Sequence, residues 1–252
     1  MQMLMMIVRF RRLAMILLTA CATATSAAPI TKVGVMSAAG RDVQVVVRAP
    51  TTGTRLDQNA RDRLQVGDAI ERIVLKAVAD SVRRHGYGEA LPLALPAKGS
   101  VPWQRDGDAV LVTQTLFDAA KKAGLSHLLL IQPARGEANL KLYRSSSGAG
   151  QLEGLGFYVD TMLEVVREDN NQPAAGFLAP YVYVDMLLVD VATLDLQTVY
   201  RARASVAVAD PGRQGNDPWQ ALSTERKVDA LRYLIEEETE RAVQQWKAAP
   251  AR

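Results

Sequence analysis

The sequence predicts one mixed α/β domain, in which helices pack on a sheet that contains long antiparallel hairpins. Apolar, β-branched segments of strand length alternate with segments whose apolar residues repeat at helical spacing. The two longest strand-like segments lie close to the C-terminus, and an amphipathic segment with a long apolar stripe follows them. We expect a single domain over residues 29–252, after an N-terminal segment that takes no part in the fold.

Residues 1–28 have the pattern of a secretory signal peptide. Arg9, Arg11 and Arg12 form a basic start, residues 13–18 are apolar, and small residues follow. The apolar run is shorter than the roughly 20 residues that a membrane-spanning helix needs. The sequence therefore predicts an exported protein of a bacterial-type cell envelope, either in the periplasm or attached to the outer membrane.

Two processing routes fit this segment. Residues 18–21 (LTAC) resemble the lipobox of bacterial lipoproteins, in which the cysteine becomes the lipidated first residue of the mature protein. Cys21 is the only cysteine of the chain, and its lipid would be the only contact of the protein with a membrane. The alternative is ordinary cleavage after Ala24 or near Ala27 or Ala28, which also satisfies the small-residue rule.

The composition of the expected domain excludes several classes of function. The chain has 30 basic and 27 acidic residues, and residues 1–28 hold three arginines and no acid, so the remainder is formally neutral. A nucleic-acid-binding domain would be expected to carry a basic stripe, and we therefore expect no nucleic-acid partner. Without Cys21 the domain has no cysteine, which excludes disulfides, thiol catalysis and cysteine-ligated metals. We expect no cofactor.

The first half of the domain is predicted to alternate strands and helices. Ile70, Ile73 and Val74 begin a stripe with helical spacing, and glycines 86 and 124 are typical helix stops. Residues 126–132 (SHLLLIQ) are almost wholly apolar, which indicates a buried central strand. In chain order we expect a hairpin of residues 33–36 and 43–48, a polar loop through residue 63, a helix from Asp68 to His85, a strand over 91–95, a helix from Asp106 or Asp108 to Ala123, and a strand over 126–132.

The second half is predicted to be richer in strands. We expect a hairpin of residues 139–144 and 154–166 with a Gly/Ser-rich tip, a polar turn over 168–173, long strands over 181–191 and 198–208, and a helix over 219–247. One stripe of this helix should dock on the sheet. Its members are Val228, Leu231, Ile235, Ala242 and Trp246.

The last hairpin allows a prediction of register. Val182, Val184, Met186 and Leu188 share one face, and the even-numbered residues 200–208 share a face of the partner strand. A slip of one residue would expose one of these apolar sets, so even-numbered residues must lie opposite even-numbered ones. A loop of residues 193–195 gives that parity and sets Asp185 opposite Arg203. We interpret this pair as a cross-strand ion pair worth about 0.2–1 kcal/mol; the alternative is a binding pair.

The order of these elements resembles a recurrent periplasmic module. Residues 119–132 (AAKKAGLSHLLLIQ) lead from a helix into a strand, and residues 181–206 form a hairpin whose first strand ends in Leu188-Val189-Asp190 with Thr193 after it. This is similar to the curli-secretion lipoprotein, to penicillin-binding-protein activator lipoproteins and to the N-terminal domain of the Tol-system propeller protein. Leu194 stands where that motif has glycine, and Ser126-His127 stands where it has Asp-aromatic. The resemblance implies a mixed sheet covered by helices, a protein-binding or assembly role, and no catalytic residue.

The residues that most often carry catalysis or metals form no familiar motif in this chain. His85 lies at a helix C-terminus, where a cation favours the helix dipole, and His127 begins an apolar strand. No His-Glu-x-x-His or Gly-x-Ser-x-Gly motif is present. Asp57-x-Asn59 begins like a calcium loop, but Arg61 occupies the third ligand position, which argues against calcium. We predict no metal site.

Two sets of side chains remain as candidate sites. Phe157, Tyr158, Tyr181 and Tyr183 could form an aromatic binding patch, or they could cover the edge of the core. Asp160 and Glu164 could be paired carboxylates for glycosidic chemistry, which would require them to be about 5–9.5 Å apart across a cleft. The acidic residues Glu236, Glu237, Glu238 and Glu240 are expected on the solvated face of the last helix.

Two candidate functions therefore remain. The favoured one is an exported, non-enzymatic envelope protein that binds another envelope protein or assembles a complex, with or without a lipid anchor at Cys21. The alternative is a periplasmic hydrolase or small-ligand-binding protein with its site near Asp160, Glu164 and the Gly-rich tip. No residues of the sequence form a set with recognisable catalytic roles, which favours the first function.

Overall fold

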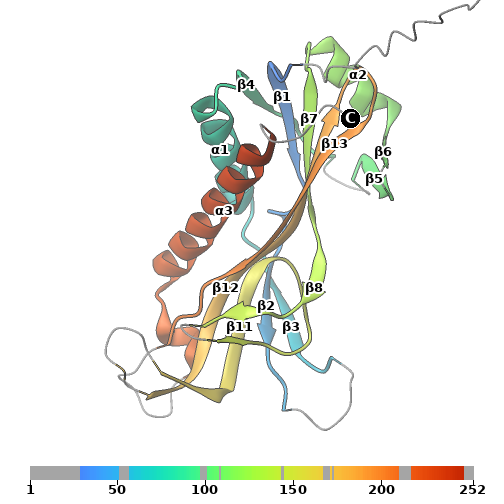
Figure 1. The fold of residues 1–252 in the computed structure, drawn as a ribbon. Coiled ribbons are helices and arrows are strands. Elements are labelled where there is room, and N and C mark those ends of the chain that lie inside the picture. The colour runs from blue at the N-terminus through green and yellow to red at the C-terminus, as the bar shows by residue number, and fades with distance from the viewer. Residues whose placement is uncertain are drawn as a thin grey trace, which may run out of the picture.

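The computed structural model describes residues 29–50, 57–96, 101–107, 109–142, 145–166, 171, 173–209 and 217–246. One large mixed sheet runs through the molecule, and helices pack on it (Figure 1). The strands are β1 (Lys32–Ser37), β2 (Val43–Val47), β3 (Ala60–Leu64), β4 (Glu89–Pro92), β5 (Trp103–Asp106), β6 (Ala109–Val112), β7 (His127–Pro133), β8 (Arg135–Glu137), β9 (Leu140–Lys141), β10 (Ser146–Ser147), β11 (Gln151–Val166), β12 (Pro173–Asp190) and β13 (Leu196–Ser205). The helices are α1 (Ala69–Arg84), α2 (Gln114–Lys122) and α3 (Thr224–Trp246), with a 3₁₀ turn η1 (Pro218–Ala221). The predicted mixed α/β fold is confirmed.

The long strand β12 organises the sheet. Among the described strands the order is β3-β2-β11-β12-β7-β1-β4, with β13 paired to β12 and β8 paired to β11. One edge of β12 pairs first with β11, over residues 173–183, and then with β7, over residues 184–190. The other edge pairs antiparallel with β13 over residues 181–189. This shared strand joins the two ends of the elongated molecule in Figure 1.

The predicted parity of the last hairpin is confirmed, but its predicted register is wrong by two residues. Val182 lies opposite Ala204 and Met186 opposite Tyr200, so even-numbered residues pair with each other. Asp185 lies opposite Arg201, not Arg203, because the turn closes at Asp190 and Asp195 and not around residues 193–195. An irregularity between Leu188 and Val189 then shifts the pairing by one residue, which gives the even parity. The predicted ion pair nevertheless forms across the diagonal, since Arg203 Nη2 lies 3.2 Å from Asp185 Oδ1.

The turn of this hairpin contains a residue in an unusual backbone conformation. Leu194 has a φ of 62°, in the left-handed region that favours glycine. Its N–H donates to the carbonyl oxygen of Asp190, at 2.9 Å, and Asp190 N donates to Asp195 O, at 3.0 Å. The turn therefore keeps a conformation that suits glycine although leucine occupies the position.

The main core lies between the sheet and the helices α1 and α3. The even-numbered residues of β12 point to this side, and the apolar stripe of α3 packs on them. Leu231, Ile235, Ala242 and Trp246 of the predicted stripe are buried there, and Val228 is half-buried. Burying a side chain such as Leu231 or Ile235 stabilises the fold by about 1.5–3 kcal/mol. Two further clusters cover the other face, one beneath α2, β5 and β6 and one around the tyrosines of β11 and β12.

The predicted hairpin of residues 33–36 and 43–48 is wrong. β1 pairs in parallel with β4 and β7, whereas β2 pairs in parallel with β11 and antiparallel with β3. Between the two strands the chain crosses the start of α1 so closely that a Cβ at Gly40 would lie 2.6 Å from Glu71 N. This close approach carries the chain to another part of the sheet.

The polar segment before α1 is also a strand, not a loop. All five residues of β3 are exposed, because it is an outer strand that pairs with β2 alone among the described strands. Because neither face of β3 is buried, its sequence lacks the apolar–polar alternation from which a strand is predicted. Helix α1 follows as predicted, although Asp68 at its N-cap makes no side-chain capping bond. Strand β4 begins two residues before the predicted start at residue 91.

The second predicted helix begins too early. A short hairpin of β5 and β6 occupies its first turns, with Trp103 and Val110 buried in it. Helix α2 starts only after Thr113, whose side chain accepts the N–H of Leu116. Asp106 therefore ends a strand and caps nothing, and Asp108 lies outside the described residues.

Two further boundaries differ from prediction. Of the predicted strand over 139–144, residues 139–142 are described and do not pair with β11: β9 pairs with β10, and the partner of the start of β11 is β8. The predicted turn at 168–173 lies mostly outside the described residues. The last helix begins at Thr224 and not at Trp219, which belongs to η1. Lys247 lies outside the described residues.

Candidate functional site

An open groove of about 580 Å³ lies between the end of β13 and helix α3. One wall is formed by Tyr233, Glu237 and Arg241, which recur every four residues and so lie on one side of α3. This side adjoins the buried stripe of the helix, and its residues therefore stand at the border of the sheet. The opposite wall comes from residues 203–207, at and just beyond the end of β13, and from Lys141 of β9.

Tyr233 is the most prominent side chain of this region. It is 58% exposed, although its aromatic ring is large. A second open groove, of about 570 Å³, lies on its other side between α1 and α3, so Tyr233 lines both grooves. Val206, which lines the first groove, is also exposed. Exposed tyrosines beside arginines are typical of protein-binding surfaces, because they combine a large contact area with polar bonds.

Part of the charge at the groove is neutralised by the protein itself. Arg241 donates to Glu237 Oε1 at 2.5 Å and to Glu238 Oε1 at 2.6 Å. Glu238 is buried and also accepts the hydroxyl of Tyr200, at 2.8 Å. Burial, reinforced by this carboxylate, raises the pKa of Tyr200, so the hydroxyl keeps its proton and donates. These bonds fix the wall formed by α3.

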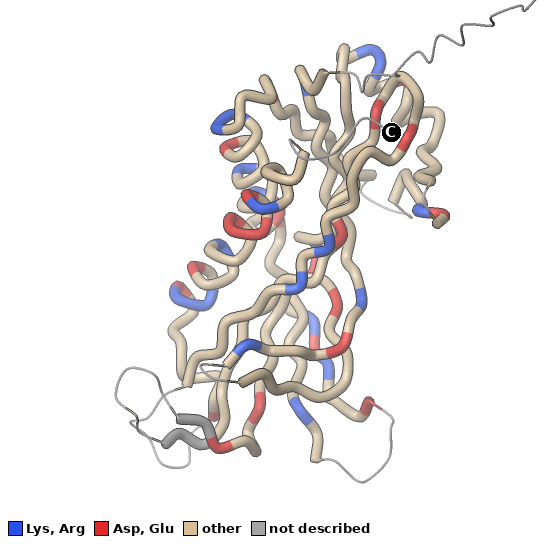
Figure 2. The backbone as a smooth tube through the Cα atoms, in the orientation of Figure 1, with Lys and Arg blue, Asp and Glu red and all other residues tan. Residues whose placement is uncertain are grey.

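The opposite wall keeps an excess of positive charge. Arg203 Nη1 donates to the carbonyl oxygens of Val184 and Ala202, at 3.1 and 2.6 Å, and Nη2 reaches Asp185. Lys141 on this wall is exposed and has no ion-pair partner among the described residues. The same holds for Arg201, which lies on β13 next to the groove and does not line it. Basic positions accordingly line the middle of β13 in Figure 2.

A polar network joins α1 to α3 beside the second groove. Glu240 Oε2 accepts the hydroxyl of Ser81 at 2.7 Å, and Glu240 Oε1 lies 2.5 Å from His85 Nε2. Burial alone would raise the pKa of Glu240, but the bonds from Ser81 and His85 outweigh it and lower the pKa. His85 is the C-cap of α1, as its predicted place at a helix end requires. Ser81 bonds the carboxylate and not the imidazole, so these residues are not arranged as a catalytic triad.

The predicted solvated acidic run on the last helix is wrong in part. Glu236 is exposed, but Glu238 is only 3% exposed and Glu240 is half-buried. The difference arises because positions 234, 235, 238 and 242 share the side of α3 that meets the sheet.

The four candidate aromatic residues do not form an exposed patch. Phe157 is 4% exposed, Tyr158 and Tyr181 are 0% exposed, and Tyr183 is 2% exposed. Phe157 packs edge-on against Trp219 on the helix side, whereas the tyrosines lie in the cluster on the other face. This placement corresponds to the alternative that they complete the core. Tyr183 also donates its hydroxyl to Glu137 O, at 3.0 Å, which holds β8 against the sheet.

Asp160 and Glu164 do not face each other across a cleft. The carboxylate of Asp160 is fully buried, and it accepts Arg48 Nη1 at 2.7 Å and the N–H groups of Met162 and Leu163. Glu164 is exposed beyond the irregularity that separates the two residues in β11. Asp160 therefore shapes a bend of the strand, and the alternative hydrolase loses the pair on which it depended.

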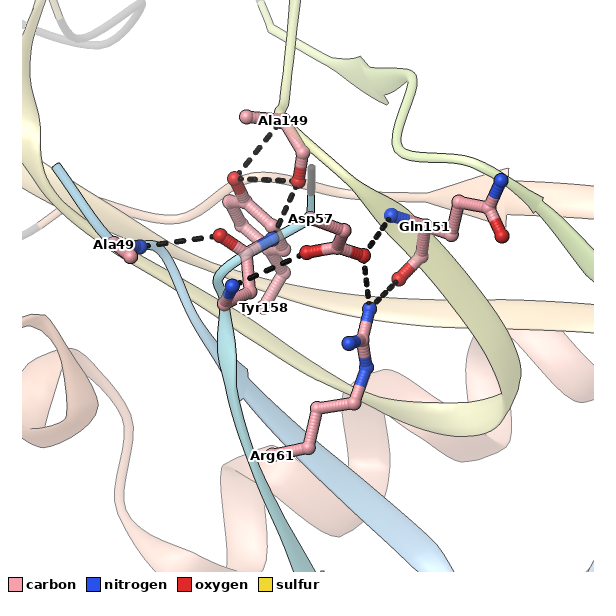
Figure 3. Close-up of polar contacts among 7 residues, drawn as sticks. Ala49, Asp57, Arg61, Ala149, Gln151 and Tyr158 are labelled. Atoms are coloured by element: carbon pink, nitrogen blue, oxygen red, sulfur yellow. Dashed lines mark hydrogen bonds and ion pairs between the residues drawn. The ribbon is translucent and has the colours of Figure 1, made fainter. Parts of the chain in front are cut away.

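The calcium-like segment forms a clamp between residues 57–61 and residues 149–151 (Figure 3). Asp57 accepts a bond from Arg61, at 2.5 Å, and the N–H of Gln151, at 2.9 Å. Asn59 holds the same loop through Ala149 O, at 2.6 Å. Burial would raise the pKa of Asp57, but the bonds from Arg61 and the two backbone N–H groups lower it. The guanidinium of Arg61 thus occupies the place that a cation would take.

The remaining candidates are His127 and Cys21. His127 is 2% exposed, its Nδ1 lies 3.1 Å from Ser126 Oγ, and its Cα partner on β12 is Asp190. Burial lowers the pKa of His127, and Asp190 opposes this effect. His127 is therefore a neutral core residue near pH 7. Cys21 lies outside the described residues.

Sequence reasoning missed Tyr233 as a candidate, although the sequence holds a signal for it. Leu231 and Ile235 define the apolar stripe, and residue 233 is turned about 200° from residue 231 on a helix, so it lies on the polar side. Tyrosine is enriched at protein interfaces, so an aromatic residue on this helix face would have pointed to the surface.

The described residues show neither a metal-binding cluster nor a membrane-spanning helix. They contain no group of three or more His, Cys, Asp or Glu residues that could hold a metal ion. Within the same residues, no helix has both the length and the apolar character required to span a membrane.

Comparison with known proteins gives only distant similarities. No family model and no curated protein matches the chain. Among solved structures, the PelC dodecamer from Paraburkholderia phytofirmans aligns with a TM-score of 0.31 at 13% identity, covering 88% of this chain and 93% of that one. Protein XCC0632 from Xanthomonas campestris, of family model DUF330, aligns with a TM-score of 0.37 at 10% identity, covering 87% and 85%. The hypothetical protein CT253 from Chlamydia trachomatis aligns with a TM-score of 0.29 at 10% identity, covering 84% and 97%.

Proposed function

We propose that this chain is an exported, non-enzymatic protein of the cell envelope that binds another envelope protein at the groove between β13 and α3. The observation that carries the binding role is Tyr233, a 58% exposed aromatic ring that lines two open grooves. A tyrosine of this kind would bury a large area in a complex at a low entropic cost, as interface anchors do.

The export part of the proposal is supported by the sequence of residues 1–28. Its basic start, apolar run and small-residue exit are typical of a secretory signal. The resemblance of residues 119–132 and 181–206 to periplasmic modules agrees with that compartment. The signal would be removed either by cleavage before a lipidated Cys21, which leaves an anchored protein, or by cleavage near Ala24, which leaves a released one.

Mass spectrometry of the mature N-terminus tests export. A diacylated Cys21 would give an anchored protein, and a free N-terminus at residue 25 or later would give a released one. Cys21→Ala is the matched variant: it should release the protein from the membrane fraction in the first case and change nothing in the second. Recovery of the intact chain from the cytoplasm would contradict export.

Site-specific photo-crosslinking in living cells tests the binding role. A photoreactive residue in place of Tyr233, and separately of Val206, should give adducts of the same size that contain the same protein. Arg72 of α1 is the control position, since it is exposed and lines neither groove. Adducts that are absent at both groove positions, or equally strong at Arg72, would contradict a specific site here.

A further inference from the structure

We propose that the bound segment of the partner is an extended, acidic strand that adds to the free edge of β13. This inference rests on the proposed function and names the chemistry of the same groove. Strand addition uses main-chain hydrogen bonds for affinity and alternate side chains for specificity.

Backbone hydrogen bonds show which residues of β13 face outward. Leu178 and Val208 exchange both of their N–H···O bonds, at 2.9 and 2.8 Å, and Val206 N donates to Pro180 O at 3.2 Å. These even-numbered pairs share one register with the pairs of β12 and β13. In an antiparallel ladder the bonded pairs alternate, so even-numbered residues of β13 direct their N–H and C=O groups to β12. The corresponding groups of Val199, Arg201 and Arg203 therefore point away from the sheet.

This outward edge is open along most of the strand. Among the described strands, β13 forms a ladder only with β12. A bridge between Ala109 and Asp195 closes one end, and a bond from Lys141 N to Ser205 Oγ, at 3.1 Å, marks the other. The groove beside α3 begins at Arg203 and continues past the end of the strand. An extended segment can therefore pair with residues 197–204 and continue into the groove.

The side chains along this edge favour acidic residues on one face of the incoming strand. Arg201 and Arg203 project from the face opposite α3, because odd-numbered residues share it. Opposite charges on neighbouring strands attract, and like charges repel. On the α3 side, the small Ala204 and the ring of Tyr233 line the groove and leave the incoming strand apolar neighbours.

The same arginines make a second copy of the chain a poor occupant. Antiparallel pairing of β13 with its own copy would set arginines against arginines across the new ladder, which destabilises it. Charged side chains on an edge strand are a general defence against such self-pairing. The charge pattern that opposes a copy attracts an acidic segment.

The probe is a synthetic peptide of nine residues in which glutamate alternates with valine or threonine. Its two controls are the same peptide with lysine for glutamate, and the same peptide N-methylated at every second residue, which removes the ladder donors. Amide hydrogen exchange of the exported domain is followed by NMR. In the free domain, amides of Tyr200, Ala202 and Ala204 should exchange slowly and those of Val199, Arg201 and Arg203 rapidly. The glutamate peptide should slow the odd-numbered set by about tenfold or more, and neither control should.

A charge-matched pair of variants tests the recognition. Arg201→Glu should weaken peptide binding by about fivefold to tenfold, because one cross-strand attraction becomes a repulsion. Arg72→Glu changes the net charge equally on another surface and should leave binding unchanged.

Three outcomes would overturn strand addition. The first is that the glutamate peptide does not bind, and the second is that it binds without slowing the exchange of the odd-numbered amides. The third is that the odd-numbered amides of the free domain are already protected, increasingly so at higher protein concentration, because this would place a second copy on the edge. The crosslinks at Tyr233 are independent of these readouts. If the crosslinks form but strand addition fails, the proposed function still holds. If the crosslinks are absent while the peptide protects the odd-numbered amides as expected, the proposed function is refuted and strand addition is not.

Discussion

The ion pair of Arg48 and Asp160 gives a quantitative test of the fold around the bend of β11. The side chain of Asp160 is fully buried and that of Arg48 is 21% exposed, and their atoms lie 2.7 Å apart. Arg48→Met would leave the carboxylate buried beside a thioether. Breaking a buried pair on one side costs about 3–5 kcal/mol. The N–H groups of Met162 and Leu163 still bond Asp160, so we expect a loss of about 2–3 kcal/mol, below that range.

The double variant Arg48→Met/Asp160→Asn separates the pair from its surroundings. It removes both charges, and it also removes Arg48 Nε, which is buried without a hydrogen-bond partner among the described residues. We therefore expect the double variant to be more stable than Arg48→Met by about 1 kcal/mol or more. Urea denaturation at pH 7 measures both free energies of unfolding. A loss below about 0.5 kcal/mol for Arg48→Met, or a double variant less stable than the single one, would refute the assignment.

Three further changes have expected outcomes. Leu194→Gly should raise the melting temperature slightly or leave it unchanged. The strain of a leucine in the left-handed conformation, about 1–2 kcal/mol, is removed, and this gain exceeds or offsets the entropy that glycine loses on folding. A clear drop of the melting temperature would contradict this. The pKa of Asp57 is lowered in the folded protein, so its contribution to stability is present above its ordinary pKa of 3.8 and is lost as pH falls through the lowered value. Asp57→Asn should therefore flatten the acid side of a curve of stability against pH. An unchanged acid side would count against the clamp. Tyr200→Phe should cost about 1–3 kcal/mol in chemical denaturation because buried Glu238 loses a donor, whereas Tyr233→Phe should cost nothing measurable.

The elements that could be predicted from sequence are those whose burial is visible within the segment itself. Helix α1 and helix α3 each bury one apolar face, so periodicity identified them. Strand β7 is buried on both faces, and its continuous apolar run identified it. The parity of β12 and β13 follows from the same reasoning, since any odd shift would expose an apolar set.

Strand pairing could not be predicted in the same way, because partners are chosen over long distances. β2 follows β1 closely in the chain, yet it pairs with β11, where Val43 lies opposite Leu155. Short segments were ambiguous for another reason. The hairpin of β5 and β6 has only four residues in each strand, too few for periodicity to distinguish it from the first turn of a helix.

The candidate site was missed because it joins elements that are separate in sequence. The last helix was predicted, but its groove depends on β13 and β9 beside it. At Asp57 the local sequence already argued against a calcium loop, because Arg61 cannot be a calcium ligand. In the structure the guanidinium of Arg61 bonds to Asp57 within the clamp. The aromatic residues of β11 and β12 gave no such local sign, because burial of Tyr158 and Tyr181 depends on segments packed above them.

The two arginines of β13 differ in what they can contribute to recognition. Arg203 is held by two carbonyl oxygens and by Asp185, so it is already satisfied and its charge is largely compensated. Arg201 is exposed without an ion-pair partner among the described residues, and its outward backbone groups lie at the open part of the edge. An acidic strand gains most where the charge it meets is uncompensated. Substitution of Arg201 should therefore affect binding alone, whereas substitution of Arg203 should also destabilise the sheet, because it would leave the carboxylate of Asp185, 13% exposed, with the more distant Arg105 at 3.7 Å.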